Sequence, residues 1–452
     1  MSSPTYQVTD PSTGEVVETF DAATDAEVEA ALDASDGAYA AWKDVPITER
    51  AEVVKRVAAL FAERADELAE IAEKEMGKPT GEGREEAEFC QAIFEYFADE
   101  GPTLAADQPI KSFSGGKAVV QKLPVGPLLG IMPWNFPFYQ IARFAAPNLM
   151  LGNTIILKHA ESVPRSALAV AQIMKDAGVP EGVYVNVFAT HDQIETIIAD
   201  PRVRGVSLTG SERAGAVVAA LAGKNLKKCV LELGGSDPMI VLDSDDLDSV
   251  IDNAWDFRMY NTGQACNSNK RMIVMEDLFD DFVSKMTEKA LAVDSFSPLS
   301  SRRAAETLAA QVDEAVSQGA TLHAGGVLGD GPAAFYSPAV LSGITEDMAA
   351  YREELFGPVV VVYKVGSDEE ALTLANDTTY GLGGSVFSAD PERATRIAQR
   401  LECGMANVNT TAGEGAEIPF GGVKRSGFGR ELGPLGMDEF VNKRMFYVAD
   451  NS

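Results

Sequence analysis

Two residues stand where their side chains could do covalent or acid–base chemistry. Cys266 follows Asn261-Thr-Gly-Gln-Ala265 in an otherwise helical region, and the glycine permits a turn that leaves the thiol accessible. Glu232 ends the apolar run Cys229-Val-Leu231, where we expect desolvation to raise its pKa toward that of a general base. Taken singly, a cysteine is more often a small buried hydrophobe, and a strand-terminal acid is more often a surface charge. Each residue is therefore a candidate catalytic group, and the other motifs in the sequence must decide between a catalytic and a structural role.

The rest of the sequence argues against hydrolytic triads and metal sites. The chain has three histidines, none close to a nucleophile motif, so Ser-His and Cys-His arrangements have few possible bases. Its four cysteines lie far apart and form no CxxC pair, which argues against a zinc site and against a secreted disulfide framework. We therefore expect free thiols, no bound metal and a reducing compartment.

A weaker signal indicates an anion site at the start of a helix. The segment Leu208-Thr-Gly-Ser211 runs from a strand into a helix that begins at Ser211, and helix N-terminal N–H groups bind anions such as phosphates. The spacing is not GxGxxG, and a Gly-Ser cap serves folding equally well. Lys158 also follows a strand, and Glu161 is placed to accept both hydroxyls of a ribose. Without a ligand to bind, a lysine at the end of a strand is usually a solvated surface charge.

The charge balance restricts the partners. The chain of 452 residues has 38 Lys and Arg against 68 Asp and Glu, a net charge of −30, which repels nucleic acids and anionic membrane surfaces. No apolar run approaches the length of a membrane span, and residues 1–15 lack the features of a signal peptide, so we expect a cytoplasmic protein. A high-salt cytoplasm would screen this acidic, halophilic-type surface. Stability that stays flat from low to molar KCl would refute that hypothesis.

The elements that must position these residues alternate regularly. Helical spacing covers residues 26–76 and 85–98, and β-branched strands then alternate with helices, which predicts a doubly wound parallel sheet of an α/β fold. The five strands are expected at residues 128–132, 154–158, 183–188, 204–208 and 228–233. A second alternating set is expected at residues 239–242, 271–274, 359–363 and 383–387. Residues 112–122 suggest a projecting hairpin, and residues 444–448 a last strand.

Eight motifs taken in order resemble the aldehyde dehydrogenase superfamily over nearly the whole chain. They are Pro133-Trp-Asn-Phe-Pro137, Gly152-Asn-Thr154, Lys158 with Glu161, Gly210-Ser211, Glu232-Leu-Gly-Gly235, Gly263-Gln-Ala-Cys266, Glu353-Glu-Leu-Phe-Gly-Pro358 and Pro419-Phe-Gly-Gly422. The resemblance implies a Rossmann-like cofactor domain (residues 1–110 and 125–233), a second α/β catalytic domain (234–435) and a small β oligomerisation arm (111–124 and 436–452). It also implies a homodimer or homotetramer.

The resemblance assigns a role to each catalytic candidate. Cys266 would attack an aldehyde carbon, and the Asn135 side-chain amide with the Cys266 backbone N–H would hold the oxyanion. Hydride transfer to a nicotinamide would leave a thioester, and Glu232 would activate the water that hydrolyses it. Because relatives that pass the acyl group to coenzyme A commonly lack this glutamate, we expect a free carboxylic acid as the product.

The resemblance also implies a nicotinamide dinucleotide site. Lys158 and Glu161 would bind the adenosine ribose, Ser211 the pyrophosphate and Glu354 the nicotinamide ribose. The other residues expected at the cofactor are Ile131, Trp134, Gly210, Gly215, Leu233 and Phe356. Because a carboxylate repels a 2′-phosphate, Glu161 favours NAD, with NADP as the alternative.

The substrate is the least determined part of the prediction. Arg143 resembles the arginine that binds the distal carboxylate in succinate-semialdehyde dehydrogenases, and the short chain resembles their compact branch. Phe144 replaces a lysine common in the family, and Glu414 and Glu417 could repel an acidic substrate. A broad-specificity enzyme for uncharged aldehydes, a structural role for Arg143 paired with a surface acid, and a catalytically silent scaffold remain the alternatives.

Overall fold

The computed structural model describes residues 6–113 and 115–450. Its first sheet has the order β17-β9-β8-β5-β6-β7, with β9 to β7 parallel and β17 antiparallel. The strands are β5 (Pro127–Met132), β6 (Thr154–His159), β7 (Tyr184–Asn186), β8 (Gly205–Thr209), β9 (Lys228–Glu232) and β17 (Gly427–Phe428). The connecting helices are α5 (Tyr139–Leu151), α6 (Pro164–Asp176), α7 (His191–Ala199) and α8 (Glu212–Lys224). The five-stranded doubly wound sheet predicted from the sequence is confirmed.

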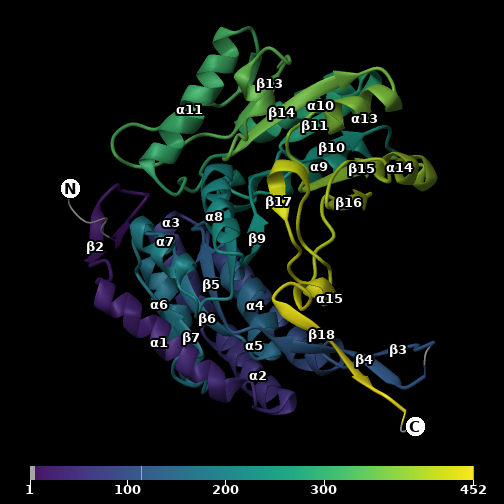
Figure 1. Cartoon of the computed structure of the whole chain (residues 1–452). Coiled ribbons are helices and arrows are strands. Elements are labelled where there is room, and N and C mark those ends of the chain that lie inside the picture. The colour runs from purple at the N-terminus through teal and green to yellow at the C-terminus, as the bar shows by residue number, and fades with distance from the viewer. Residues whose placement is uncertain (1–5, 114, 451–452) are drawn as a thin grey trace.

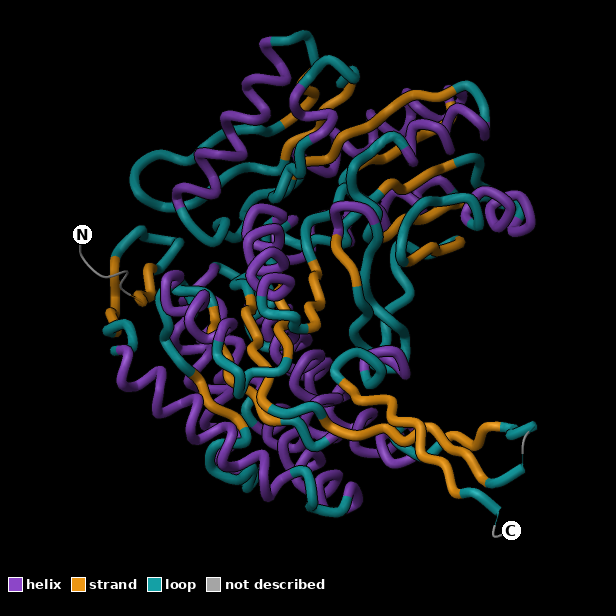
Figure 2. The backbone as a smooth tube through the Cα atoms, viewed as in Figure 1, coloured by secondary structure: helices purple, strands orange, loops and turns teal. Residues whose placement is uncertain are grey.

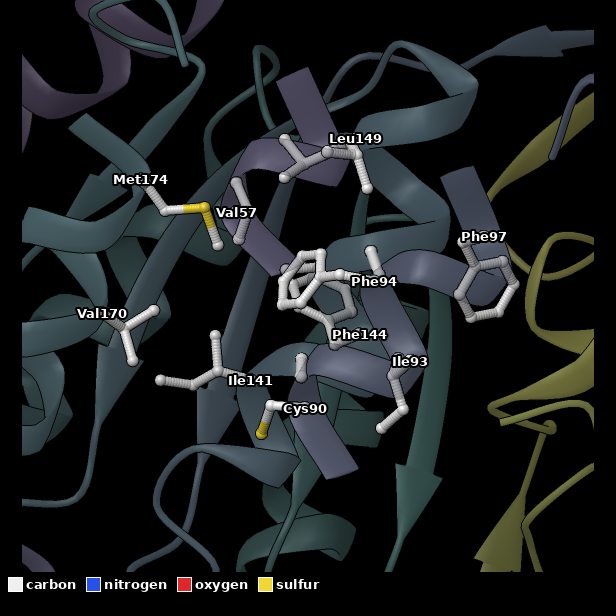
Figure 3. Close-up of a cluster of buried hydrophobic side chains, with 14 of the residues drawn as sticks. Val57, Cys90, Ile93, Phe94, Phe97, Ile141, Phe144, Leu149, Val170 and Met174 are labelled. Atoms are coloured by element: carbon white, nitrogen blue, oxygen red, sulfur yellow. The ribbon is translucent and has the colours of Figure 1, made fainter. Parts of the chain in front are cut away.

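Helices pack on both faces of this sheet (Figure 2). Successive strand residues point to opposite faces, so Leu128 enters one core cluster and Leu129 the other. The N-terminal elements are β1 (Tyr6–Thr9), β2 (Val16–Phe20), α1 (Asp25–Trp42), α2 (Ile47–Glu63), α3 (Ala65–Met76) and α4 (Thr80–Leu104). Figure 3 shows the larger cluster, in which Phe144 lies close to Phe94 and Ile141. Phe144, noted in the sequence beside Arg143, is thus a core residue.

The second sheet has seven strands in the order β12-β13-β14-β11-β10-β15-β16. These are β10 (Pro238–Val241), β11 (Arg271–Met275), β12 (Thr321–Ala324), β13 (Ala339–Ser342), β14 (Val359–Val365), β15 (Gly383–Phe387) and β16 (Met405–Val408). Its helices are α9 (Leu247–Met259), η1 (Tyr260–Gly263), α10 (Glu276–Leu291), α11 (Arg302–Ser317), α12 (Ala349–Arg352), α13 (Asp368–Asn376) and α14 (Pro391–Ala398). All four strands expected in this domain are present.

A three-stranded arm projects from the body (Figure 1). It joins β3 (Gln108–Ile110) and β4 (Lys117–Pro124) to β18 (Val441–Val448). The hairpin therefore begins before residue 112, where the sequence placed it, and Ser114 in its turn lies outside the described residues, as do residues 451–452 of the expected arm.

The chain returns to the first sheet before residue 435, where the sequence placed the end of the second domain. After η2 (Lys424–Ser426), β17 pairs with β9, and α15 (Gly433–Gly436) follows.

Across residues 6–113 and 115–450, no helix is long and apolar enough to cross a membrane, and no three His, Cys, Asp or Glu side chains are grouped to hold a metal ion.

Candidate active site

A cavity of about 490 Å³ lies where the two sheet domains meet, and Cys266 is part of its wall. Aromatic side chains from α5, the segment before it and the C-terminal segment form much of the lining, including Phe136, Tyr139 and Phe420. The charged lining residues in the described part of the chain are all acidic: Glu85, Glu86, Asp237, Asp256 and Glu414. The cavity thus offers a thiol, an aromatic wall and a negative surface.

The turn predicted before Cys266 is present. Helix α9 ends at Met259, and Asn261, Thr262 and Gly263 then have φ angles of 52°, 54° and 73°. A Cβ atom at Gly263 would collide with the backbone carbonyl of Gly357, so glycine is required both for the left-handed conformation and for the close approach. This turn brings the Cys266 thiol to the cavity wall.

Four charged groups act on the Cys266 thiol. Burial raises its pKa to about 11, Arg143 and Lys270 lower the pKa, and the carboxylates of Glu354 and Asp237 raise it. Burial and the two carboxylates therefore favour the neutral thiol, whereas Arg143 and Lys270 favour the thiolate.

The Asn135 side chain is held against the loop that contains Cys266. Its Nδ2 donates a hydrogen bond to the Gln264 carbonyl at 3.1 Å, two residues before the nucleophile. In return, Asn261 Nδ2 donates to the Asn135 carbonyl at 2.8 Å. Glu86 fixes the next turn, since its Oε1 accepts hydrogen bonds from the N–H groups of Phe138 and Tyr139 at 2.8 and 2.9 Å. These hydrogen bonds join the Asn135 loop to the Cys266 loop.

Glu232 ends β9 with a buried side chain. Neither carboxylate oxygen has a hydrogen-bond partner within the described residues, and a Cβ on Gly421 would lie only 2.6 Å from Oε1. Burial raises the Glu232 pKa well above its usual value, Arg143 opposes this, and Glu431 adds to it. A buried carboxylate that lacks partners is costly and is suited to take up a proton.

Arg143 is fully buried and engaged. It forms an ion pair with Glu431 and donates to Thr209 Oγ1 at 3.1 Å. Its guanidinium carbon lies 4.9 and 4.6 Å from the ring centres of Tyr139 and Phe420, which line the cavity. Arg143 thus lies behind the aromatic wall, and its acid partner is buried, unlike the surface acid considered from the sequence.

The expected nicotinamide residues gather beside Cys266. Glu354 Oε1 accepts a hydrogen bond from the Gly235 N–H at 3.2 Å and lies 3.2 Å from Lys270 Nζ. The rings of Trp134 and Phe356 pack edge to face with centres 5.9 Å apart. Lys270 links this group to the thiol loop, because its Nζ also donates a hydrogen bond to the Cys266 carbonyl at 2.8 Å.

The expected adenosine and phosphate residues lie at the carboxyl ends of β6 and β8, the two strands that flank β5. Lys158 Nζ lies 2.6 Å from Glu161 Oε1, and His191 Nε2 lies 3.3 Å from the same oxygen. Ser211 caps α8, where its Oγ accepts a hydrogen bond from the Ala214 N–H at 3.3 Å. The remaining positions are Ile131 in β5, Gly210 before the cap, and Gly215, where a Cβ would lie 2.7 Å from the Leu233 side chain. Only glycine lets α8 approach β9 this closely.

Several polar residues at the site were missed in the sequence. Lys270, Arg258, Gln264, Asn261 and Glu431 all make buried contacts with the loops described above. A signal existed for Lys270 and Gln264, which lie within four residues of Cys266. Glu431 carried none, because its partner Arg143 is 288 residues away in the chain, and such a pairing is visible only in the fold.

Comparisons with known proteins place this geometry in one family. The profile of the aldehyde dehydrogenase family matches residues 1–446. A succinate-semialdehyde dehydrogenase [NADP(+)] of Deinococcus radiodurans is 51% identical, covering 97% of this chain and 94% of that protein, and one of Mycobacterium avium is 42% identical, covering 98% and 96%. The crystal structure of succinic semialdehyde dehydrogenase from Streptococcus pyogenes in complex with NADP⁺ has a TM-score of 0.96 at 40% identity, covering 98% of this chain and all of that one. The chain belongs to the aldehyde dehydrogenase family.

Proposed function

We propose that this enzyme oxidises succinate semialdehyde to succinate with NAD(P)⁺, through a thioester on Cys266. The observation that carries the chemistry is the assembly of the Cys266 thiol and the Asn135 amide, with the unpartnered Glu232 carboxylate in the same electrostatic surroundings. The named activity of the Deinococcus and Mycobacterium relatives supports the substrate.

In the proposed mechanism the Cys266 thiol loses its proton to water, the thiolate Sγ bonds to the aldehyde carbon, and the carbonyl oxygen becomes an oxyanion. The Asn135 Nδ2 and the Cys266 backbone N–H donate hydrogen bonds to that oxyanion. Ser211 and Glu354 would hold the nicotinamide cofactor, which would supply the hydride acceptor, so that the acyl group would remain on Sγ as a thioester. Glu232 takes a proton from water, and the resulting hydroxide releases the acid and restores Sγ.

The residues present suit a nicotinamide dinucleotide. Ser211 and the first N–H groups of α8 would hold the pyrophosphate, and Glu354 the nicotinamide ribose. At the adenosine end, Lys158 beside Glu161 offsets the carboxylate that favoured NAD in the sequence, and the His191 Nε2 lies 3.3 Å from the same oxygen. A structure with NADP⁺ and one with NAD⁺, from Streptococcus pyogenes and Bacillus cereus, both resemble this chain. We therefore propose that both cofactors are used.

An absorbance assay tests this function directly. The rise at 340 nm is followed with succinate semialdehyde and with uncharged aldehydes of similar length, each with NAD⁺ and NADP⁺. We expect the highest kcat/KM with succinate semialdehyde. A protein that produces no NAD(P)H from any aldehyde contradicts the proposal.

One observation favours oxidation of uncharged aldehydes as a second candidate. The charged cavity lining is acidic, and the cation proposed for the substrate carboxylate, Arg143, is paired with Glu431. If Arg143 turns from Glu431 to the substrate, Arg143→Met raises KM for succinate semialdehyde and leaves uncharged aldehydes unaffected. Equal kcat/KM for both classes in the wild type would favour the second candidate.

Replacing Asn135 with alanine tests the proposed oxyanion site. We expect kcat/KM to fall by about 10²- to 10³-fold, because one donor to the developing charge is lost. Cofactor affinity, followed by fluorescence titration, should change little. A loss confined to cofactor affinity would instead assign Asn135 to the dinucleotide site.

We further propose that the arm joins copies of this chain into a dimer or tetramer in the cytoplasm. Strand β18 exposes Met445, Phe446, Tyr447 and Val448 at 64%, 49%, 42% and 52% of their surfaces, and an exposed apolar strand is a pairing surface. Light scattering should give a mass above one chain, and Met445→Lys with Tyr447→Lys should lower it. A monomeric wild type would refute the assembly.

A further inference from the structure

Lys270 is a buried cation whose contacts are all at the active site. Its side chain is 2% exposed, and its Nζ donates to the carbonyls of Ala265 and Cys266 at 2.7 and 2.8 Å. The third polar contact of Lys270 Nζ is an ion pair with Glu354 Oε1 at 3.2 Å. An ammonium group has three donors, so one side chain connects the nucleophile loop to the carboxylate proposed to hold the nicotinamide ribose.

A second buried cation shows what purely structural bracing of these loops looks like. Arg258 donates to the Gly263 carbonyl and the Ser268 hydroxyl in the nucleophile loop, and to the carbonyls of Leu355 and Gly357 in the facing loop. Arg258 therefore holds the two loops together through the backbone. Lys270, in contrast, contacts the Cys266 residue itself and an ionised side chain.

The surroundings of Glu354 make its connection to Lys270 specific. The Gly235 N–H donates to the same oxygen that faces Lys270, and a Cβ on Gly234 would lie 2.5 Å from the other oxygen. The carboxylate is thus confined between a backbone donor, a glycine surface and one ammonium group. Removing that ammonium leaves a half-buried negative charge close to the thiol.

We infer that Lys270 is a positioning residue that couples the Cys266 nucleophile to the Glu354 carboxylate. The inference rests on the proposed roles of these two residues. Through its two carbonyl contacts Lys270 orients the Cys266 backbone, whose N–H is the second proposed donor to the oxyanion. Through its charge it offsets Glu354 and Asp237, while Arg143 acts on the thiol from the other side. The same contact holds Glu354 in place for the cofactor.

The test measures alkylation of Cys266 by iodoacetamide without cofactor, from neutral to alkaline pH, with the site identified by mass spectrometry. In Lys270→Met the favourable charge is lost, and we expect the pH profile to move to higher pH, with alkylation at neutral pH about tenfold slower. Lys270→Arg should restore most of the rate. Glu354→Gln should move the profile to lower pH. Lys364→Met, which removes an exposed lysine, is the matched control and should leave the profile unchanged.

Cofactor binding supplies a second readout. Both Lys270→Met and Glu354→Gln should raise KM for the cofactor several-fold, and the double variant should show less than the sum of the two effects, because each single change already breaks the same contact. An unchanged alkylation profile in a folded Lys270→Met protein overturns the inference. If that variant does not fold, Glu354→Gln decides the outcome, because an unshifted profile in this variant also overturns the inference.

The test also separates this inference from the proposed function. Alkylation requires only the thiol, whereas turnover requires the aldehyde and the cofactor. A wild type that oxidises no aldehyde but shows the expected profile shifts would refute the function and retain the coupling. A wild type that oxidises the aldehyde, together with a Lys270→Met profile identical to that of the wild type, would support the function and refute the coupling.

Discussion

Cys266→Ala is expected to abolish NAD(P)H formation, with a loss in kcat of at least about 10⁴-fold. The reason is that the thiol is the group that forms the bond to the aldehyde carbon, and neither Asn135 nor Glu232 can replace it. The thiol lies at a cavity wall, so its removal opens little new space, and the melting temperature should change only slightly. Steady-state absorbance and thermal unfolding measure the two effects.

Cys403→Ala is the control for this experiment. Cys403 is also a free, half-buried cysteine of the second domain, and its thiol contacts the Met405 carbonyl at 3.2 Å. We expect this variant to retain wild-type turnover. Retained activity in Cys266→Ala, or equal losses in both variants, would contradict the proposed nucleophile.

Glu232→Gln is expected to separate the two halves of the reaction. The thioester should still form, giving a burst of NAD(P)H of about one equivalent per site, because Glu232 does not bond to the aldehyde. Steady-state turnover should fall by about 10²- to 10⁴-fold, since no base remains to activate the water. Rapid-mixing absorbance resolves the burst from the steady state. A proportional loss of both phases would assign Glu232 to the first step.

The raised pKa of Glu232 also fixes the sign of two pH effects. The carboxylate must be ionised to accept a proton, so wild-type deacylation should rise with pH through this raised pKa, and the variant should lose that rise. For stability, a carboxyl with a raised pKa in the folded state favours folding below its unfolded pKa and loses that advantage as the pH rises. Glu232→Gln should therefore raise the melting temperature at neutral pH and leave it unchanged in acid. A destabilised variant at neutral pH would mean that Glu232 is held by favourable contacts.

The fold and the family followed from local patterns in the sequence. The alternation of β-branched strands and helices identified the sheets, because strands buried on both faces need apolar residues at every position. The residues around Cys266 similarly indicated their turn, and Gly263 adopts it. Both signals lie within a few residues of the feature that they predict, and the family match confirms the resemblance drawn from the eight motifs.

The surroundings of the charged residues could not be predicted in this way. Arg143 was assigned to a substrate because its position on a helix is local information, whereas its pairing with Glu431 depends on how the C-terminal segment folds back. The cofactor preference derived from Glu161 had the same weakness, since Lys158 and His191 share its carboxylate. The distances between charged residues that are far apart in the chain are set by the fold. The sequence identifies these residues but does not show which of them pair.

The return of the C-terminal segment to the first sheet has a consequence for how the enzyme is synthesised. Gly427 pairs with Glu232, the Leu233 N–H donates to the Ser426 carbonyl at 2.9 Å, and Gly421 closes over the carboxylate. A nascent chain that has reached residue 410 already contains Cys266 and Asn135, but its Glu232 is still open to water. Glu232 acquires its raised pKa only after residues 411–428 have been synthesised and docked, which takes about 1 to 4 seconds at a translation rate of roughly 5 to 20 residues per second. The surroundings that raise the Glu232 pKa are therefore completed late in synthesis, after the part of the chain that contains Cys266 has been made.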